Sequence, residues 1–145
     1  MTCPFCDAEI IRKEEFHATR HFLCFSNHKP VLPGHSLIIP KRHVETILDM
    51  NDEELHELAP LMKKLAAILM KAYGCSGVDI ALQDGAAAGA SVAHLHWHVV
   101  PRKAGDIDGD PSLWMAKIIE AERGRQTVTD EEMRAHVERI RRDMK

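Results

Sequence analysis

The chain has 145 residues, the length of a single domain with a proper core, and a formal net charge of −3. That charge excludes the broad basic surface through which proteins hold nucleic-acid polymers. The apolar runs are short and broken by charges, and the N-terminus lacks a basic stretch followed by an apolar one, so we expect no membrane span and no export signal. A cytoplasmic location is the default expectation, and four cysteines in such a chain argue against a disulfide framework.

The first predicted elements are two strands, at residues 20–27 and 35–39, with a turn at Pro33-Gly34 between them. His35 therefore opens the second strand. Cys24 and Cys75 are expected to be small, mostly buried thiols.

A long helix is predicted over residues 52–73. Asn51 is its expected N-cap, with Glu54 three residues later completing a capping box, and Gly74 ends it. Pro60 should bend this helix or break its first turns. The core-facing stripe is expected to consist of Leu55, Leu58, Met62, Leu65, Leu69 and Ala72.

Two further strands are predicted at residues 78–83 and 92–100, joined by a loop of small residues at 84–90. A loop of this length is too short for a parallel crossover, so the two strands should be antiparallel. A short helix is expected around residues 113–121.

A last helix is predicted from Asp130, capped by Thr129 with Glu132 completing the box. Its apolar stripe is thin, so it packs either on the domain or on a second subunit, unless it is a solvated tail. The stripe consists of Met133, Val137, Ile140 and Met144.

Three histidines, His94, His96 and His98, alternate with apolar residues in the predicted strand 92–100. Successive side chains of a strand point to opposite faces, so the three rings share one face and the apolar residues share the other. Imidazole exchanges a proton near neutral pH, at a reference pKa of about 6.5. Three imidazoles on one face therefore indicate a functional site rather than core filling.

The His-x-His-x-His run followed by Val99-Val100 resembles the signature of the histidine-triad (HIT) nucleotide hydrolases and transferases. Other blocks resemble the Fhit branch in the same order, and the resemblance covers about residues 27–106. These blocks are Lys29 to His35, Gln83-Asp84-Gly85, Gly89-Ala90-Ser91 and Pro101 to Asp106.

The resemblance implies an α+β, HIT-like fold: an antiparallel sheet of about five strands, one long helix and C-terminal helices. The whole chain, 1–145, would be one HIT domain, with a knuckle at 1–8 and a helical extension at 107–145. It also implies a nucleotide hydrolase that cleaves dinucleoside polyphosphates at the α-phosphate through a nucleotidyl-histidine.

By the same resemblance, His96 is the nucleophile, because a neutral imidazole can attack phosphorus when an acceptor holds its other nitrogen. His98 would contact the phosphate and assist proton transfer, while His35 and His94 would support the nucleophile from behind. His35 could instead be a simple turn residue, and His94 a metal-binding or supporting group.

Several residues are expected to bind the nucleotide. Gln83 and Ser91 bracket the small-residue loop and can donate hydrogen bonds to phosphate oxygens, while Gly89 permits close backbone approach. Asn27 matches the Fhit-branch residue that contacts the ribose, although an Asn at a strand end is also a common turn former. A divalent cation such as Mg²⁺ could accompany the substrate phosphates.

Cys3-Pro4-Phe5-Cys6 is a Cys-x-x-Cys knuckle, which supplies two thiolates to a tetrahedral zinc ion. Several bacterial HIT proteins resemble the chain here, and the resemblance implies that His43 and His94 complete a structural zinc site. The alternatives are a redox pair or two idle thiols.

The sequence is also compatible with other functions: a dinucleoside polyphosphate phosphorylase or nucleotidyltransferase, a Hint-like phosphoramidase, and a noncatalytic nucleotide sensor. The expected partner is a small nucleotide and not a nucleic-acid polymer or a membrane. A homodimer is expected from the Fhit and Hint resemblance and from the long helix, whose apolar residues exceed what one small sheet covers.

Overall fold

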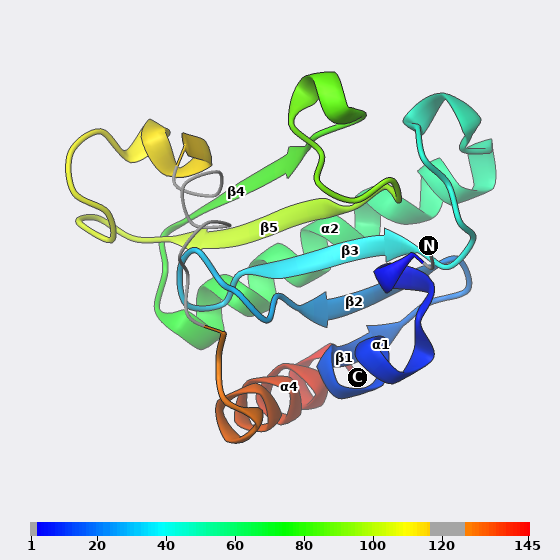
Figure 1. Cartoon of the computed structure of the whole chain (residues 1–145). Helices are drawn as coiled ribbons and strands as arrows, with labels where there is room; N and C mark the ends of the chain where they lie inside the picture. Colours follow the sequence, from blue (N-terminus) through cyan, green and yellow to red (C-terminus); the bar gives the residue numbers. More distant parts are fainter. Residues whose placement is uncertain (1–2, 117–126) are drawn as a thin grey trace.

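The structure, a computed structural model, describes residues 3–116 and 127–145. One sheet carries α2 across one face, while α1 and α4 lie beside the β1 edge (Figure 1). In chain order the elements are η1 (Pro4–Cys6), α1 (Ala8–Glu14), β1 (Glu15–Ala18), β2 (Phe22–Ser26), β3 (Ser36–Pro40), η2 (Ile47–Asp49), α2 (Asp52–Tyr73), β4 (Gly77–Leu82), η3 (Ala86–Ala88), β5 (Trp97–Arg102), η4 (Pro111–Leu113) and α4 (Asp130–Met144).

The sheet has five strands in the order β1-β2-β3-β5-β4, and all neighbouring strands are antiparallel. This confirms the predicted α+β fold and the antiparallel pairing of β4 with β5. The sequence did not predict α1 or β1, because a seven-residue helix followed at once by a four-residue strand carries too little periodicity. Asp7, whose side chain accepts hydrogen bonds from the first turn of α1, was the available signal.

Helix α2 begins and ends as predicted. Asn51 and Glu54 form the reciprocal capping box, and Gly74 takes the left-handed conformation that ends the helix. Of the two effects expected of Pro60, a bend or a break, the break in the first turns is wrong, because α2 is continuous through Pro60. Pro60 and His56, the residue four positions earlier, are both exposed, so water can satisfy the carbonyl that loses its N–H partner.

The two faces of the sheet pack against different elements, which places the histidines. Leu95, Trp97 and Val99 lie in the main core beneath α2. Phe25 and Leu37, on the opposite face, form a second cluster with Ile11 of α1. The alternation predicted for the triad segment is therefore confirmed: its apolar side chains point to α2 and its histidines to the other face.

The predicted boundaries of the triad strand, 92–100, are wrong, since β5 runs from Trp97 to Arg102. His94 and His96 precede it in a segment that bends at residues 91–94, and the Leu95 N–H donates to the Val44 carbonyl, outside the sheet ladder. The apolar side chains of Leu95, Trp97 and Val99 still share the core beneath α2, even though β3 pairs with β5 only from Trp97 onward.

Helix α4 packs on its own domain. Met133, Val137, Ile140 and Met144 are all at most 7% exposed and belong to the main core. The Lys64 ammonium also donates to the Met144 carbonyl at 2.7 Å. Of the predicted alternatives, the domain-packed helix is therefore the observed one.

The two remaining sequence predictions concern one helix and two thiols. Most of the helix expected around 113–121 lies outside the described residues, and η4 precedes it. Cys24 is fully buried as expected, whereas Cys75 is only half-buried because it follows the exposed end of α2. Within the described residues, no helix combines the length and apolarity needed to cross a membrane.

Candidate active site and metal-binding cluster

His96 lies just before β5, is only 5% exposed as a residue, and lines the wall of a pocket of about 680 Å³. Its Nδ1 lies 2.8 Å from the main-chain carbonyl of His94, an acceptor, so Nδ1 carries the proton and donates it. The lone pair of the neutral ring is therefore on Nε2. This is the protonation state that a nucleophilic imidazole needs.

His98, on β5, belongs to a chain of hydrogen bonds that begins in the backbone. The Val31 N–H donates to His35 Nδ1 at 3.1 Å, which places the proton of a neutral His35 on Nε2. His35 Nε2 lies 2.9 Å from His98 Nδ1 and donates to it, so a neutral His98 carries its own proton on Nε2. The adjoining rings of His96 and His98, 5.1 Å apart, thus differ in function: one offers a lone pair on Nε2, the other an N–H.

The pocket extends from these two rings across the sheet toward α1 and α4. Its walls combine apolar side chains with a few polar ones, as in small-molecule sites. The predicted residues Asn27 and Ser91 lie in it beside His96 and His98. Asn27 is also held in place, because its Oδ1 accepts from the Lys29 N–H at 2.9 Å.

Gln83 is not among the residues that line this pocket. Its amide donates to the Ala88 carbonyl at 3.1 Å, and it lines a neighbouring hollow with Ser91 and His94. Gly89 has φ +97°, and a Cβ there would lie 2.6 Å from Gln83 Nε2. Only glycine therefore allows the loop to close on the Gln83 amide.

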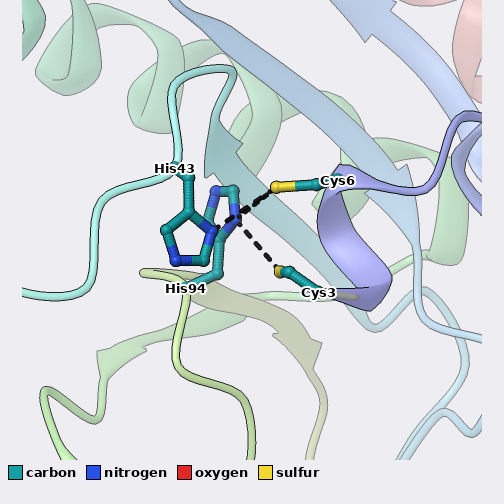
Figure 2. Close-up of side chains that lie close together, drawn as sticks. All are labelled: Cys3, Cys6, His43 and His94. Atoms are coloured by element: carbon teal, nitrogen blue, oxygen red, sulfur yellow. Dashed lines mark hydrogen bonds between the residues drawn. The ribbon is translucent and has the colours of Figure 1, made fainter. Parts of the chain in front are cut away.

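Four side chains from three segments of the chain form a compact cluster (Figure 2). Cys3 precedes η1 and Cys6 is its last residue, while His43 follows β3 and His94 precedes β5. One donor atom from each lies within 4.8 Å of all the others. Cys3 Sγ is 3.4 Å from His94 Nδ1, and Cys6 Sγ is 3.4 Å from His43 Nδ1.

These separations fit a tetrahedral metal site. Bond lengths of about 2.0 Å to nitrogen and 2.3 Å to sulfur place neighbouring ligands of a tetrahedral ion roughly 3.3–3.8 Å apart. The far nitrogens are also held: His94 Nε2 donates to the Pro40 carbonyl at 2.9 Å, and His43 Nε2 to a Glu45 carboxylate oxygen at 3.2 Å. Both Nδ1 lone pairs consequently face the sulfurs, as metal-binding imidazoles require. Burial lowers the pKa of His94, which favours the neutral ring.

His94 joins the cluster to the candidate nucleophile. Its side chain belongs to the cluster, while its main-chain carbonyl accepts the His96 proton. Phe5, between the two cysteines, places its ring 5.1 Å from that of His96. Sequence reasoning overlooked Phe5, although an aromatic residue inside a knuckle is a signal for packing between the knuckle and its neighbours.

Arg102, in the block Pro101 to Asp106, lies in a separate hollow. Its guanidinium contacts Asp106 at 2.8 Å and Asp79 at 2.6 Å, and these hydrogen bonds raise its pKa. Because the arginine is already paired, it connects β4, β5 and the following loop rather than offering an anion site.

The HIT domain family model matches residues 10–105, and the chain belongs to that family. It is 32% identical over 142 residues to a bis(5′-adenosyl)-triphosphatase of Dictyostelium discoideum, covering 97% of this chain and 93% of that protein. It is 38% identical over 96 residues to the asymmetrical bis(5′-nucleosyl)-tetraphosphatase of Schizosaccharomyces pombe, covering 66% of this chain.

The chain spans 53% of the length of the S. pombe protein. It spans 22% of the length of a nitrilase and fragile histidine triad fusion protein of Caenorhabditis elegans, which is 41% identical over 99 residues, or 68% of this chain.

Solved structures show the same fold. A hypothetical histidine triad nucleotide-binding protein of Sulfolobus tokodaii superposes with a TM-score of 0.77 at 26% identity, covering 98% of this chain and 91% of that one. A zinc-bound histidine triad family protein of Mycobacterium smegmatis superposes with a TM-score of 0.69 at 28% identity, covering 95% and 94%.

Proposed function

We propose that this protein hydrolyses dinucleoside polyphosphates at the α-phosphate through a nucleotidyl-histidine on His96. The observation that carries the proposal is the hydrogen bond from His96 Nδ1 to the His94 carbonyl. This bond holds the ring and leaves the Nε2 lone pair at the pocket wall. The names of the D. discoideum and S. pombe relatives, a triphosphatase and a tetraphosphatase of dinucleosides, support the substrate class.

In the first half-reaction, His96 Nε2 forms a bond to the α-phosphorus, and the bond from that phosphorus to the bridging oxygen breaks. The leaving oxygen departs as part of a nucleoside phosphate anion, and the His98 Nε2–H, whose position follows from the His35 hydrogen bond, stabilises it by donating a hydrogen bond. A nucleotidyl-His96 and a shortened nucleotide result. His94 acts as a positioning residue, because it holds His96 through its main-chain carbonyl.

In the second half-reaction, water attacks the same phosphorus and the bond to His96 breaks. The attacking water releases one proton to the solvent and leaves its hydroxyl group on the phosphorus, while the His98 Nε2–H continues to donate to the phosphate, so His96 regains its Nε2 lone pair. Ser91 at the pocket wall can donate to a phosphate oxygen, and Asn27 can contact the ribose. Gln83 would have to release the Ala88 carbonyl to reach the same phosphate.

The test is incubation with diadenosine triphosphate, diadenosine tetraphosphate and adenosine phosphoramidate in ¹⁸O-labelled water, with and without inorganic phosphate. We expect AMP carrying the label, because water attacks the α-phosphorus. Label in the other product, or no AMP from any dinucleotide, contradicts the proposal. A nucleoside diphosphate formed from added phosphate identifies a phosphorylase instead.

We also propose that Cys3, Cys6, His43 and His94 hold a structural zinc ion. The donor set, the ligand separations and the outer hydrogen bonds fit it, and the zinc-bound M. smegmatis protein supports it. A bound ion would neutralise the thiolates and fasten the N-terminal segment to the triad segment. A divalent cation on the substrate phosphates stays a prediction.

We further propose that residues 1–145 form one HIT domain, which includes the knuckle at 1–8 and the extension at 107–145, and that this domain assembles as a homodimer. The long helix does not support the dimer, because Leu58, Leu65 and Leu69 are already buried within one chain. Support comes from β4, which ends the sheet order and exposes 42% of Ile80. Light scattering at micromolar concentration tests it, and a monomeric mass contradicts it.

A further inference from the structure

Glu14, the last residue of α1, lies at the wall of the nucleotide pocket, and the mechanism above does not use it. It is only 9% exposed, although it carries a carboxyl group. Its nearest charged partner is His28, whose Nδ1 lies 3.7 Å from Oε1, beyond hydrogen-bond distance. Within residues 3–116 and 127–145, the Glu14 carboxyl forms no hydrogen bond, so its oxygens can serve a ligand.

The register of the sheet fixes how far Glu14 lies from the triad. Across the strands, His98 pairs with Leu37, Leu37 with Phe25, and Phe25 with Glu15. Neighbouring strands are about 4.8 Å apart, so the backbone beside Glu14 is roughly 14 Å from that of His98. Once the side chains at both ends are counted, this is the span of one nucleoside monophosphate.

The space between the two ends suits a flat, apolar group. Phe25 and Leu37 lie along the row that joins His98 to Glu14, and Phe5 and Ile10 line the same pocket. A nucleotide whose phosphate lies at His96 and whose ribose lies at Asn27 would place its base among these apolar side chains. The outer edge of the base would then meet Glu14.

We propose that Glu14 recognises the outer edge of the nucleobase and determines which purine the protein prefers. The proposal rests on the proposed function, because it takes the phosphate to lie at His96. Guanine presents two neighbouring donors, N1–H and the N2 amino group, whereas adenine presents the N6 amino group beside the acceptor N1.

The protonation state of Glu14 decides which edge fits. An ionised carboxylate accepts both guanine donors, while a protonated carboxyl donates to adenine N1 and accepts from N6. Burial raises the pKa of Glu14 to about 7. Preference for guanine over adenine should therefore increase with pH across the neutral range.

Other groups around the pocket also carry charge, and the test must separate them from Glu14. They are Lys13 on α1, His28 and Lys29 after β2, Asp130 on α4, and the triad residues His96 and His98. GMP and AMP share the same ribose phosphate, so effects of these groups on the phosphate cancel in the ratio of the two affinities.

The test is calorimetric binding of GMP and AMP at about pH 6 and pH 8. For the wild type we expect the affinity ratio of GMP to AMP to rise at least about fivefold with pH. In Glu14→Gln the ratio should lose this dependence and shift toward AMP by about tenfold or more at the higher pH, because an amide offers guanine one acceptor where the carboxylate offers two.

Glu15→Gln is the matched control, since it makes the same change one residue away and outside the pocket lining, and it should behave as the wild type. His28→Gln should keep the pH dependence. A wild-type ratio that does not change with pH overturns the proposal without any variant, as does an unchanged ratio in a folded Glu14→Gln protein. Either result leaves the hydrolase proposal intact. If the protein neither binds these nucleotides nor turns over a dinucleotide, both the hydrolase proposal and the Glu14 proposal are contradicted.

Discussion

Replacing Glu14 by Gln should stabilise the unliganded protein at alkaline pH and leave it nearly unchanged at acidic pH. Burial raises the pKa of Glu14 from 4.5 to about 7, so between these values the folded state binds more protons than the unfolded state. Stability conferred by the protonated carboxyl is therefore present below about pH 4.5 and lost as the pH rises through 7. The glutamine side chain does not titrate, so the variant avoids this loss.

The full difference in pKa corresponds to about 3.4 kcal/mol, of which about 2.5 kcal/mol falls between pH 5 and pH 8. The Glu14 carboxyl lines an open pocket, and solvent there weakens the penalty, so we expect about 1–2 kcal/mol. All other titrating groups are common to both proteins and cancel in the difference.

Urea unfolding of the wild type, Glu14→Gln and the control Glu15→Gln at both pH values measures this difference. At each pH we subtract the free energy of unfolding of the wild type from that of Glu14→Gln. This difference should be about 1–2 kcal/mol larger at pH 8 than at pH 5. If the two proteins differ by the same amount at both pH values, Glu14 ionises as freely in the folded state as in the unfolded chain, and the burial argument is refuted.

Three further predictions concern the triad, the metal and α4. His96→Ala should lose several powers of ten in dinucleotide turnover while binding a nonhydrolysable analogue within a few fold, and the exposed His56→Ala should keep wild-type rates; near-normal turnover by His96→Ala would exclude the covalent route. Protein prepared without added metal should contain about one zinc per chain by elemental analysis. Cys3→Ser should lose bound metal and thermal stability together, and should lose less activity than His96→Ala. Cys75→Ser, outside the cluster, should retain its metal and its thermal stability. A fully active and stable metal-free protein would contradict the zinc proposal. Burial lowers the pKa of His136 on α4 to about 4, and its Nε2 is buried without a hydrogen-bond partner among the described residues. The neutral His136 ring therefore contributes stability above its unfolded pKa of about 6.5, and this contribution is lost as the pH falls. The free energy of unfolding of the wild type should decrease by about 2 kcal/mol from this source between pH 7 and pH 5. Urea unfolding of His136→Gln should not show this loss.

Much of the local structure could be predicted from short-range patterns. The capping box at Asn51 and Glu54 involves residues three positions apart, and the alternation of histidines with apolar residues follows from an extended backbone. Such features depend on neighbours along the chain, so no tertiary information is needed to find them. The sequence therefore determined the long helix, four of the five strands and the common face of the three histidines.

The contacts that give these residues their chemistry depend on tertiary structure. His35 and His98 are 63 positions apart, and Cys3 and His94 are 91 apart, so only strand pairing and the packing of the N-terminal segment bring them together. The Cys-x-x-Cys spacing indicated half of a metal site, whereas the choice of His43 and His94 rested on family resemblance until the structure showed the cluster.

Tertiary structure also decided which side chains were buried and which were already bonded. The sequence placed Gln83 at the phosphate, but the fold of the Gly89 loop supplies the Ala88 carbonyl as its partner. Glu14 belongs to no sequence motif; only the fold buries it at the pocket wall, and only the register of β1, β2 and β3 aligns its end of α1 with the row that leads to His98. The residue types and their local spacing specified which chemistry was available, and strand register and burial decided which atoms meet, because desolvation and hydrogen bonding act on neighbours in space.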